Sequence, residues 1–227
     1  IKRFPNWLMK INERLKRVAS YVDDNSYIID VGCDHALLDI YLVKNKKNIK
    51  ALASDINEGP LKYAIKNIEK YNLSDKIKTS LANGISKINS NIDTIIISGM
   101  GTSSILDIIF NDKSKLSNIK KIIISSNNNW YLLRKTFMDN GYSILDEDII
   151  LEKGKFYPII VFVKEECNYT NFELKYGPIL LKKKTDTFKN YISCEINKLN
   201  KIYNSLSQKY FIKKAKLKKE IKILVKI

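Results

Sequence analysis

Short runs of apolar residues recur along the first two thirds of the chain and predict a layered α/β protein. Only Glu152–Lys155 separate the last two of these runs, which predicts a hairpin. The segments between the first five are long enough for helices, so we expect five parallel strands there. Before the first strand, apolar residues at helical spacing predict an amphipathic helix over Trp7–Tyr21. The seven predicted strands cover residues 27–31, 51–54, 77–81, 92–98, 121–125, 143–151 and 157–163.

The end of the chain has a different composition and predicts a helical appendage. After Gly177-Pro178 there is no further Gly or Pro, and Lys is frequent. From Phe188 onward, apolar residues recur in steps of four and three, the pattern of a coiled-coil seam. Polar residues near Ser205–Lys209 would allow a reversal into two antiparallel helices, and a single long helix is the alternative. We therefore expect one domain over residues 1–166 and a basic, coiled-coil-like helical domain over 167–227.

The turn after the first predicted strand indicates a nucleoside pocket. Gly32 ends this strand, and Asp55 ends the next one, where a carboxylate can accept both ribose hydroxyls. Asp34 and His35 stand where a dinucleotide-binding turn would need further glycines, which argues against a pyrophosphate. S-adenosylmethionine carries adenosine and a cationic tail without phosphate, so Asp34 would face a cation. Capping of the following helix is a compatible role for Asp34.

The parallel strands with a terminal hairpin are typical of the class I S-adenosylmethionine-dependent methyltransferases, which have a seven-stranded, Rossmann-like sheet. Ile56 follows the ribose-binding aspartate and is a further candidate for cofactor contact. After the third strand, Asn83-Gly84 stand where an amide carbonyl can accept a hydrogen bond from the adenine amino group. An Asn-Gly pair is also an ordinary turn.

Two further loops are candidates for the substrate side. The fourth strand ends at Gly99-Met100-Gly101, whose glycines would let backbone approach a base and whose Met100 would form an apolar wall. The fifth strand leads into a polar loop in which Asn127 could read a base edge. In the same loop, Trp130 would either stack on a base or anchor the next helix in the core.

Charge adds a candidate partner, whereas cysteine and histidine content argues against a metal. The chain has 40 Lys and Arg against 24 Asp and Glu, a net charge of +16, which favours a polyanion such as RNA. Abundant Lys, Asn and Ile also suit an A+T-rich genome, so part of this excess can lack function. Three cysteines without a C-x-x-C pair and a single histidine make zinc improbable. With no long apolar run, we expect a soluble, cytoplasmic protein.

With these residues assembled, the chain resembles the TrmK family of bacterial tRNA (adenine-22-N1)-methyltransferases. The resemblance lies in several motifs: Glu13–Ala19, Asp30–Ala36, Gly59-Pro60, Ser98–Gly101, Asn127, Asp146-Glu147, Glu152–Tyr157, Gly177-Pro178 and the C-terminal helical pair. Two departures stand out. Thr102 replaces a second glycine after Gly-Met-Gly, and Ser125-Ser126 replace a Gln-Pro.

The resemblance implies methylation of N1 of an adenosine in the D-loop of tRNA. Neutral N1 has a free lone pair, so catalysis would rest on positioning, with Asp34 and Asn127 as the candidate catalytic residues. His35 would be a cofactor or structural contact rather than a base. We expect a monomer that binds tRNA and S-adenosylmethionine, does not bind a membrane and contains no metal. The alternatives are a class I methyltransferase with another substrate and a non-catalytic RNA-binding protein on the same scaffold.

Overall fold

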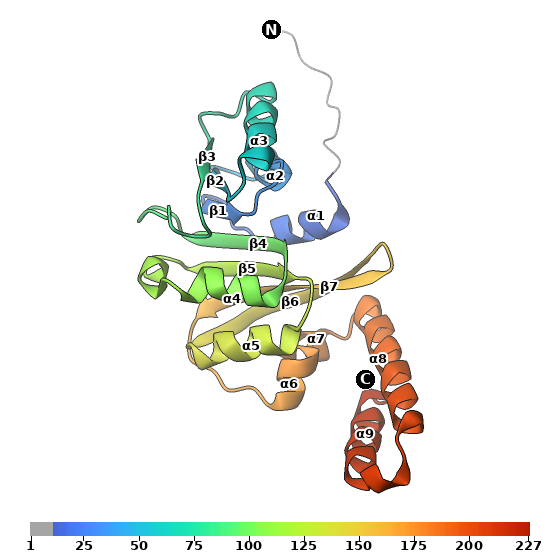
Figure 1. The fold of residues 1–227 in the computed structure, drawn as a ribbon. Helices are drawn as coiled ribbons and strands as arrows, with labels where there is room; N and C mark the ends of the chain where they lie inside the picture. Colours follow the sequence, from blue (N-terminus) through green and yellow to red (C-terminus); the bar gives the residue numbers. More distant parts are fainter. Residues whose placement is uncertain (1–10) are drawn as a thin grey trace.

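The computed structural model describes residues 11–227, and its centre is a mixed seven-stranded sheet (Figure 1). The strands lie in the order β3-β2-β1-β4-β5-β7-β6. The first five are mutually parallel, and β7 is antiparallel to both of its neighbours. Their bounds are β1 Tyr27–Val31, β2 Lys50–Asp55, β3 Ile77–Leu81, β4 Thr94–Met100, β5 Lys121–Ser126, β6 Tyr142–Glu152 and β7 Lys155–Lys164.

All seven predicted strands are confirmed, and the class I methyltransferase topology with them. The largest difference lies at the fourth strand, which was expected to begin at Ile92 and begins at Thr94. Ile92 is fully buried, but it belongs to the turn before the strand. The predicted hairpin between β6 and β7 turns on only Lys153 and Gly154, which both have positive φ angles (49° and 76°). This conformation matches the right-handed twist of the flanking strands.

Helices cover both faces of the sheet and create two apolar cores. On one face, α1 (Glu13–Ser20), α2 (Leu37–Asn45) and α3 (Glu58–Lys70) pack against the strands. On the other face, α4 (Thr102–Phe110) and α5 (Trp130–Asp139) enclose the second core, with the short helix η1 (Lys113–Leu116) beside them. The predicted first helix is confirmed over Glu13–Ser20, and its expected first turn at residues 7–10 lies outside the described residues.

The C-terminal segment forms four helices, of which the last two are an antiparallel pair that extends away from the sheet (Figure 1). The single-helix alternative is therefore excluded. Leu206 ends α8 with an extended backbone (φ −76°, ψ 133°), and the chain then reverses through η2. The elements are α6 Asn171–Tyr176, α7 Pro178–Lys183, α8 Asp186–Ser205, η2 Gln208–Tyr210 and α9 Phe211–Leu224.

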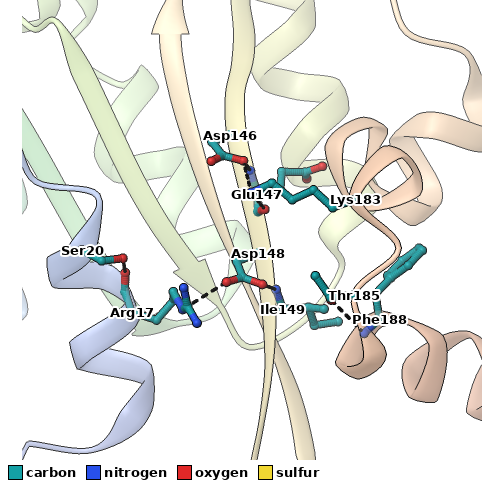
Figure 2. A network of polar contacts seen from close by, with 9 residues as sticks. All are labelled: Arg17, Ser20, Asp146, Glu147, Asp148, Ile149, Lys183, Thr185 and Phe188. Atoms are coloured by element: carbon teal, nitrogen blue, oxygen red, sulfur yellow. Dashed lines mark hydrogen bonds and ion pairs between the residues drawn. The ribbon is translucent and has the colours of Figure 1, made fainter.

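A polar network joins β6 to a helix on each side of this strand. Figure 2 shows Arg17 of α1 reaching Asp148 on β6, with 3.0 Å between Nε and Oδ2. From the other side, Lys183 of α7 donates to the Glu147 carbonyl at 2.9 Å and pairs with the Asp146 carboxylate. Strand β6 is thus held between the N-terminal helix and the segment that leads to the helical pair.

A fully buried ion pair lies beside this network. Arg134 Nε of α5 contacts Glu147 Oε1 at 2.6 Å, and both side chains are completely shielded from solvent. Arg134 also donates to the Leu174 carbonyl of α6 (3.0 Å), while Glu147 Oε2 accepts from the Ile179 N–H of α7 (3.1 Å). The pair therefore connects α5 and β6 with both short helices that precede α8.

Candidate functional site

A cavity of about 640 Å³ opens at the carboxyl ends of β1, β2 and β4. This is the edge at which open α/β sheets bind their ligands. Its volume lies within the range of about 300–1,000 Å³ that is typical of small-molecule sites. The lining combines carboxylates, amides and apolar side chains: Val31, Gly32, Asp34, Asp55, Ile56, Asn57, Ala82, Asn83, Gly84, Ser98, Gly99, Met100, Ser104, Asp107 and Ile108.

The turn after β1 brings backbone to the wall of this cavity. Gly32 has a φ angle of +75°, and its N–H donates to the Ser54 carbonyl at 2.8 Å. A Cβ on Gly32 would lie 2.3 Å from the Met100 methyl carbon, so the flexible end of that side chain would have to move, and the positive φ angle itself favours glycine at this position. Asp34 follows with φ +50° and an exposed carboxylate that faces the cavity rim. Gly32, Asp34 and Met100 therefore line the same cavity.

The ribose candidate lies at the end of the neighbouring strand. Asp55 is the last residue of β2, is largely buried, and accepts one hydrogen bond, from Asn57 N to Oδ1 at 2.9 Å. A carboxylate can accept more than one such bond, which leaves capacity for ligand hydroxyls. The next side chain, Ile56, is 63% exposed beside the cavity. An exposed isoleucine at a pocket rim can cover a flat apolar ring.

Asn83 and Gly84 line the same cavity from the loop after β3. Gly84 has φ +56°, and a Cβ there would meet the Ile108 side chain of α4 at 3.0 Å. The loop therefore lies tightly against α4, with Ile108 on the opposite wall. The sequence did not indicate Ile108, because α4 gave no signal beyond its apolar face.

Asn127 lies next to the fourth-strand turn but does not line the 640 Å³ cavity. Its Nδ2 donates to the Gly99 carbonyl at 2.6 Å, and its backbone N–H donates to the Met100 carbonyl at 2.9 Å. Asn127 thus fixes the conformation of the Gly99-Met100 turn while its side chain remains exposed. Trp130 donates to the Ser126 carbonyl and packs on Tyr191 of α8. Of the two roles considered for Trp130, this arrangement favours the anchor.

The two departures from the family pattern lie side by side in the structure. Thr102 Oγ1 and Ser126 Oγ are 2.8 Å apart and buried. Thr102 Oγ1 also donates to the Asn128 carbonyl at 2.6 Å, and the Thr102 N–H donates to Asn128 Oδ1 at 3.0 Å. The fourth-strand and fifth-strand loops are therefore joined by hydroxyls that a glycine and a proline could not provide.

A smaller cavity of about 250 Å³ adjoins the first and contains residues that the sequence did not single out. Arg14 of α1 donates to Ser98 Oγ at 3.2 Å and lies 5.1 Å from the centre of the Tyr157 ring. A Cβ on Gly99 would come within 3.3 Å of the Arg14 guanidinium. This cation is 84 positions from Ser98 in sequence, and its only sequence signal was membership of the Glu13–Ala19 motif.

His35 also lines the smaller cavity and not the larger one. Its ring makes an edge contact with Tyr63, with 5.3 Å between ring centres, and its Nε2 is 3.5 Å from Asp34 Oδ1. Both contacts suit a residue that orients Asp34. Its expected contact with the cofactor stays a prediction.

Two buried carboxyl groups lie behind the Gly32 turn. Asp30 lines the smaller cavity, and Asp39 of α2 lies close to Asp30. Burial raises the pKa of Asp30 to about 7, and burial together with the neighbouring Asp30 charge raises the pKa of Asp39. Such groups hold a proton at a pH where exposed aspartates are ionised. Burial, together with the nearby carboxylates, also raises the pKa of the Cys33 thiol, so this cysteine stays uncharged.

Neither a metal-holding group nor a candidate membrane-spanning helix is found in the described part of the chain. Residues 11–227 contain no group of three or more His, Cys, Asp or Glu side chains arranged to hold a metal ion. Within the same range, none of the helices combines the length and apolar character that a membrane crossing requires.

The sheet order, the glycine turn after β1 and the aspartate at the end of β2 define a class I S-adenosylmethionine-dependent methyltransferase. The family model described as TrmK, tRNA (adenine(22)-N(1))-methyltransferase, matches residues 28–226. The chain belongs to this family. A tRNA (adenine(22)-N(1))-methyltransferase of Bacillus subtilis (strain 168) is 31% identical over 207 residues, which are 88% of this chain and 87% of the relative.

Solved structures agree over nearly the whole chain. The TrmK of M. capricolum in complex with S-adenosylhomocysteine is 34% identical, with a TM-score of 0.80 and coverage of 95% and 96% of the two chains. A Streptococcus pneumoniae protein in complex with S-adenosylmethionine is 33% identical, with a TM-score of 0.84 and coverage of 93% and 99%. The activity is accordingly methylation of N1 of adenosine 22 in tRNA, and S-adenosylmethionine is the cofactor.

Proposed function

We propose that the 640 Å³ cavity holds S-adenosylmethionine and that the target adenosine enters beside the Gly99-Met100 turn. The observation that carries this proposal is the close approach of Gly32 to Met100, which supports a cofactor-binding turn beside a substrate-binding loop. The cofactor supplies an electrophilic methyl group on a sulfonium. The remaining work falls to residues that bind, orient and exclude water.

The cavity lining suits each part of this cofactor. Asp55 has acceptor capacity for the ribose hydroxyls, and Asn83 offers an amide carbonyl to the adenine amino group. Ile56 and Ile108 supply apolar surface for the adenine ring. Asp34 places a negative charge at the rim, which suits a cationic amino-acid tail and would disfavour a pyrophosphate. Gly32 and Gly84 give the cofactor its close backbone walls.

We assign positioning roles on the substrate side. Adenine N1 is already nucleophilic, so holding it in line with the methyl group is the main requirement. Asn127 immobilises the Gly99 carbonyl through its 2.6 Å hydrogen bond, and its own Oδ1 stays available for a base edge. Asp34 would also stabilise the positive charge that the methylated base acquires. Because N1 takes part in Watson–Crick pairing, the target base must be unpaired or extruded.

The C-terminal segment supplies the charge that a tRNA partner requires. Residues 167–227 contain 15 Lys against four Asp and Glu, so they account for +11 of the net charge of +16. This excess supports tRNA binding by the helices, with the sheet domain providing catalysis. The domain boundary at residue 166, action in the cytoplasm and the monomeric state are parts of the same proposal.

The test is incubation of the purified protein with labelled S-adenosylmethionine and an unmodified tRNA transcript, followed by nucleoside analysis. We expect 1-methyladenosine, and we expect none from a transcript with guanosine at position 22. Asp34→Asn should lower turnover at least 10-fold, whereas Asp75→Asn, at an exposed aspartate before β3, should match the wild type. Cofactor binding without methylated tRNA would favour another substrate. Absence of cofactor binding would favour the non-catalytic RNA-binding alternative.

A further inference from the structure

The far end of the helical pair exposes apolar and aromatic side chains that nothing in the described chain covers. We call residues 198–219 the hairpin tip; they include the end of α8, the reversal and most of α9. At the base of the pair, Tyr191 and Ile192 pack in a common core with Leu224, and Leu199 is the one residue of the hairpin tip that is buried in this core. Between residues 200 and 223, by contrast, no side chain is buried. Tyr210, Phe211 and Ile212 are consecutive and are 49%, 68% and 61% exposed.

The charge of the hairpin tip is one-sided. Its 22 residues contain eight lysines and no Asp or Glu. Within the residues that the structure describes, only Lys198 of these eight makes an ion pair, with Glu195 on the preceding turn. Lys209 lies 5.2 Å from the centre of the Tyr210 ring, so cationic and aromatic groups are interleaved. This pattern suits a polyanion that also offers flat apolar faces.

An unpaired nucleotide of RNA has both properties, because its phosphate is anionic and its base can stack on an aromatic ring. A second copy of this chain is a poor partner for the hairpin tip, because contact between two tips would bring together two positively charged surfaces. We infer that the hairpin tip binds the tRNA substrate at an unpaired nucleotide, with Phe211 and Tyr210 stacking on the base and nearby lysines contacting phosphates. This inference rests on the proposed tRNA substrate.

The geometry separates this contact from the methylated adenosine. Tyr191 touches Trp130 beside the substrate loop, with 5.5 Å between ring centres, and Ser205 lies 14 residues further along α8. At about 1.5 Å per residue, the end of α8 is about 21 Å beyond that contact along the helix, and the reversal with Tyr210 and Phe211 follows it. Figure 1 shows the reversal between α8 and α9 at the end of the pair that points away from the sheet. The tip would therefore read a different part of the tRNA and act as a second anchor.

The first experiment compares the double variant Tyr210→Ser/Phe211→Ser with Val225→Ser. Val225 is a matched control because it is 67% exposed on the same appendage but lies outside the hairpin tip. We expect the double variant to weaken tRNA binding and raise KM for tRNA about 10-fold or more, with KM for S-adenosylmethionine and kcat unchanged. Phe211→Trp should retain affinity, because a tryptophan can still stack.

A second measurement identifies the contacted phosphates and nucleotide. Replacing Lys213 and Lys216 by Gln should reduce the dependence of tRNA affinity on salt concentration. A photocrosslinking amino acid at Phe211 should attach to a nucleotide other than adenosine 22. If the double variant binds and methylates tRNA as the wild type does, the inference is wrong even though the enzyme is active. If the wild type methylates no tRNA, the proposed function itself fails.

Vesicles of phosphatidylglycerol provide the remaining comparison, because they are also polyanionic. Loss of vesicle binding by the double variant with unchanged tRNA binding would overturn the inference in favour of a lipid surface. Loss of tRNA binding with no vesicle binding by either protein would support it.

Discussion

Removing the charge of Glu147 should destabilise the protein far more than the removal of a surface carboxylate. Glu147→Gln keeps the side-chain volume but leaves the Arg134 guanidinium buried without its counter-ion. Breaking a buried ion pair from one side costs about 3–5 kcal/mol. For a chain of this size, that loss corresponds to a fall in Tm of about 6–20 °C. Asp139→Asn, which breaks the exposed Lys135–Asp139 pair, should change the free energy of unfolding far less, because solvent screens that pair.

The assay is urea unfolding of both variants, followed by circular dichroism. The double variant Arg134→Met/Glu147→Leu adds a test of mechanism, because it removes the buried charges together. It leaves the Leu174 carbonyl and the Ile179 N–H without their side-chain partners, at about 1–3 kcal/mol each. We expect a favourable coupling energy between the two substitutions. A fall in the free energy of unfolding of less than about 1 kcal/mol for Glu147→Gln would refute the reasoning.

Three further predictions concern the site itself. Gly32→Ala should weaken binding of S-adenosylhomocysteine at least 10-fold, measured by calorimetry, because the backbone is left-handed there and the new methyl group would meet Met100. Gly59→Ala, which has open space around it, should have no effect on this affinity. Arg14→Lys should lower kcat for tRNA with little change in Tm, since a lysine cannot reproduce the guanidinium contacts, and equal kcat would remove Arg14 from the site. Because the pKa of Asp30 is raised to about 7, the folded state binds a proton that the unfolded state releases, so the free energy of unfolding should fall as pH rises from about 4 to 7. Asp39→Asn should reduce this fall, measured as urea midpoints at each pH, and parallel pH profiles of variant and wild type would contradict the prediction.

The sequence was sufficient for the fold because most of its central strands are apolar runs. Parallel strands inside a sheet are buried on both faces, so β1 could be predicted with its observed ends. The reversal after α8 could only be left open, because Ser205–Lys209 contain neither Gly nor Pro. Which of the two arrangements forms depends on the packing of α9 against α8, and this is a property of tertiary structure.

Within the site, the sequence was informative where a strand end fixes the position of a residue. Gly32, Asp55 and Asn83 could be predicted to share one edge for this reason. Arg14 could not, because its approach to Ser98 depends on how α1 packs against the sheet. The contact between Asn127 and the Gly99 carbonyl is of the same kind, since it joins two loops whose conformations the sequence does not specify.

The position of Trp130 has a practical consequence for experiments on this protein. Its indole is hydrogen-bonded to the loop that carries Asn127 and lies against Tyr191 at the base of the helical pair. Indole fluorescence responds to polarity and to nearby tyrosines, so this residue is a native optical reporter at the junction of the two proposed domains. In a Trp7→Phe variant, where Trp130 is the one remaining tryptophan, seating of tRNA on α8 and α9 should therefore be visible as an emission change without any attached dye. Its time course would show whether docking precedes methyl transfer.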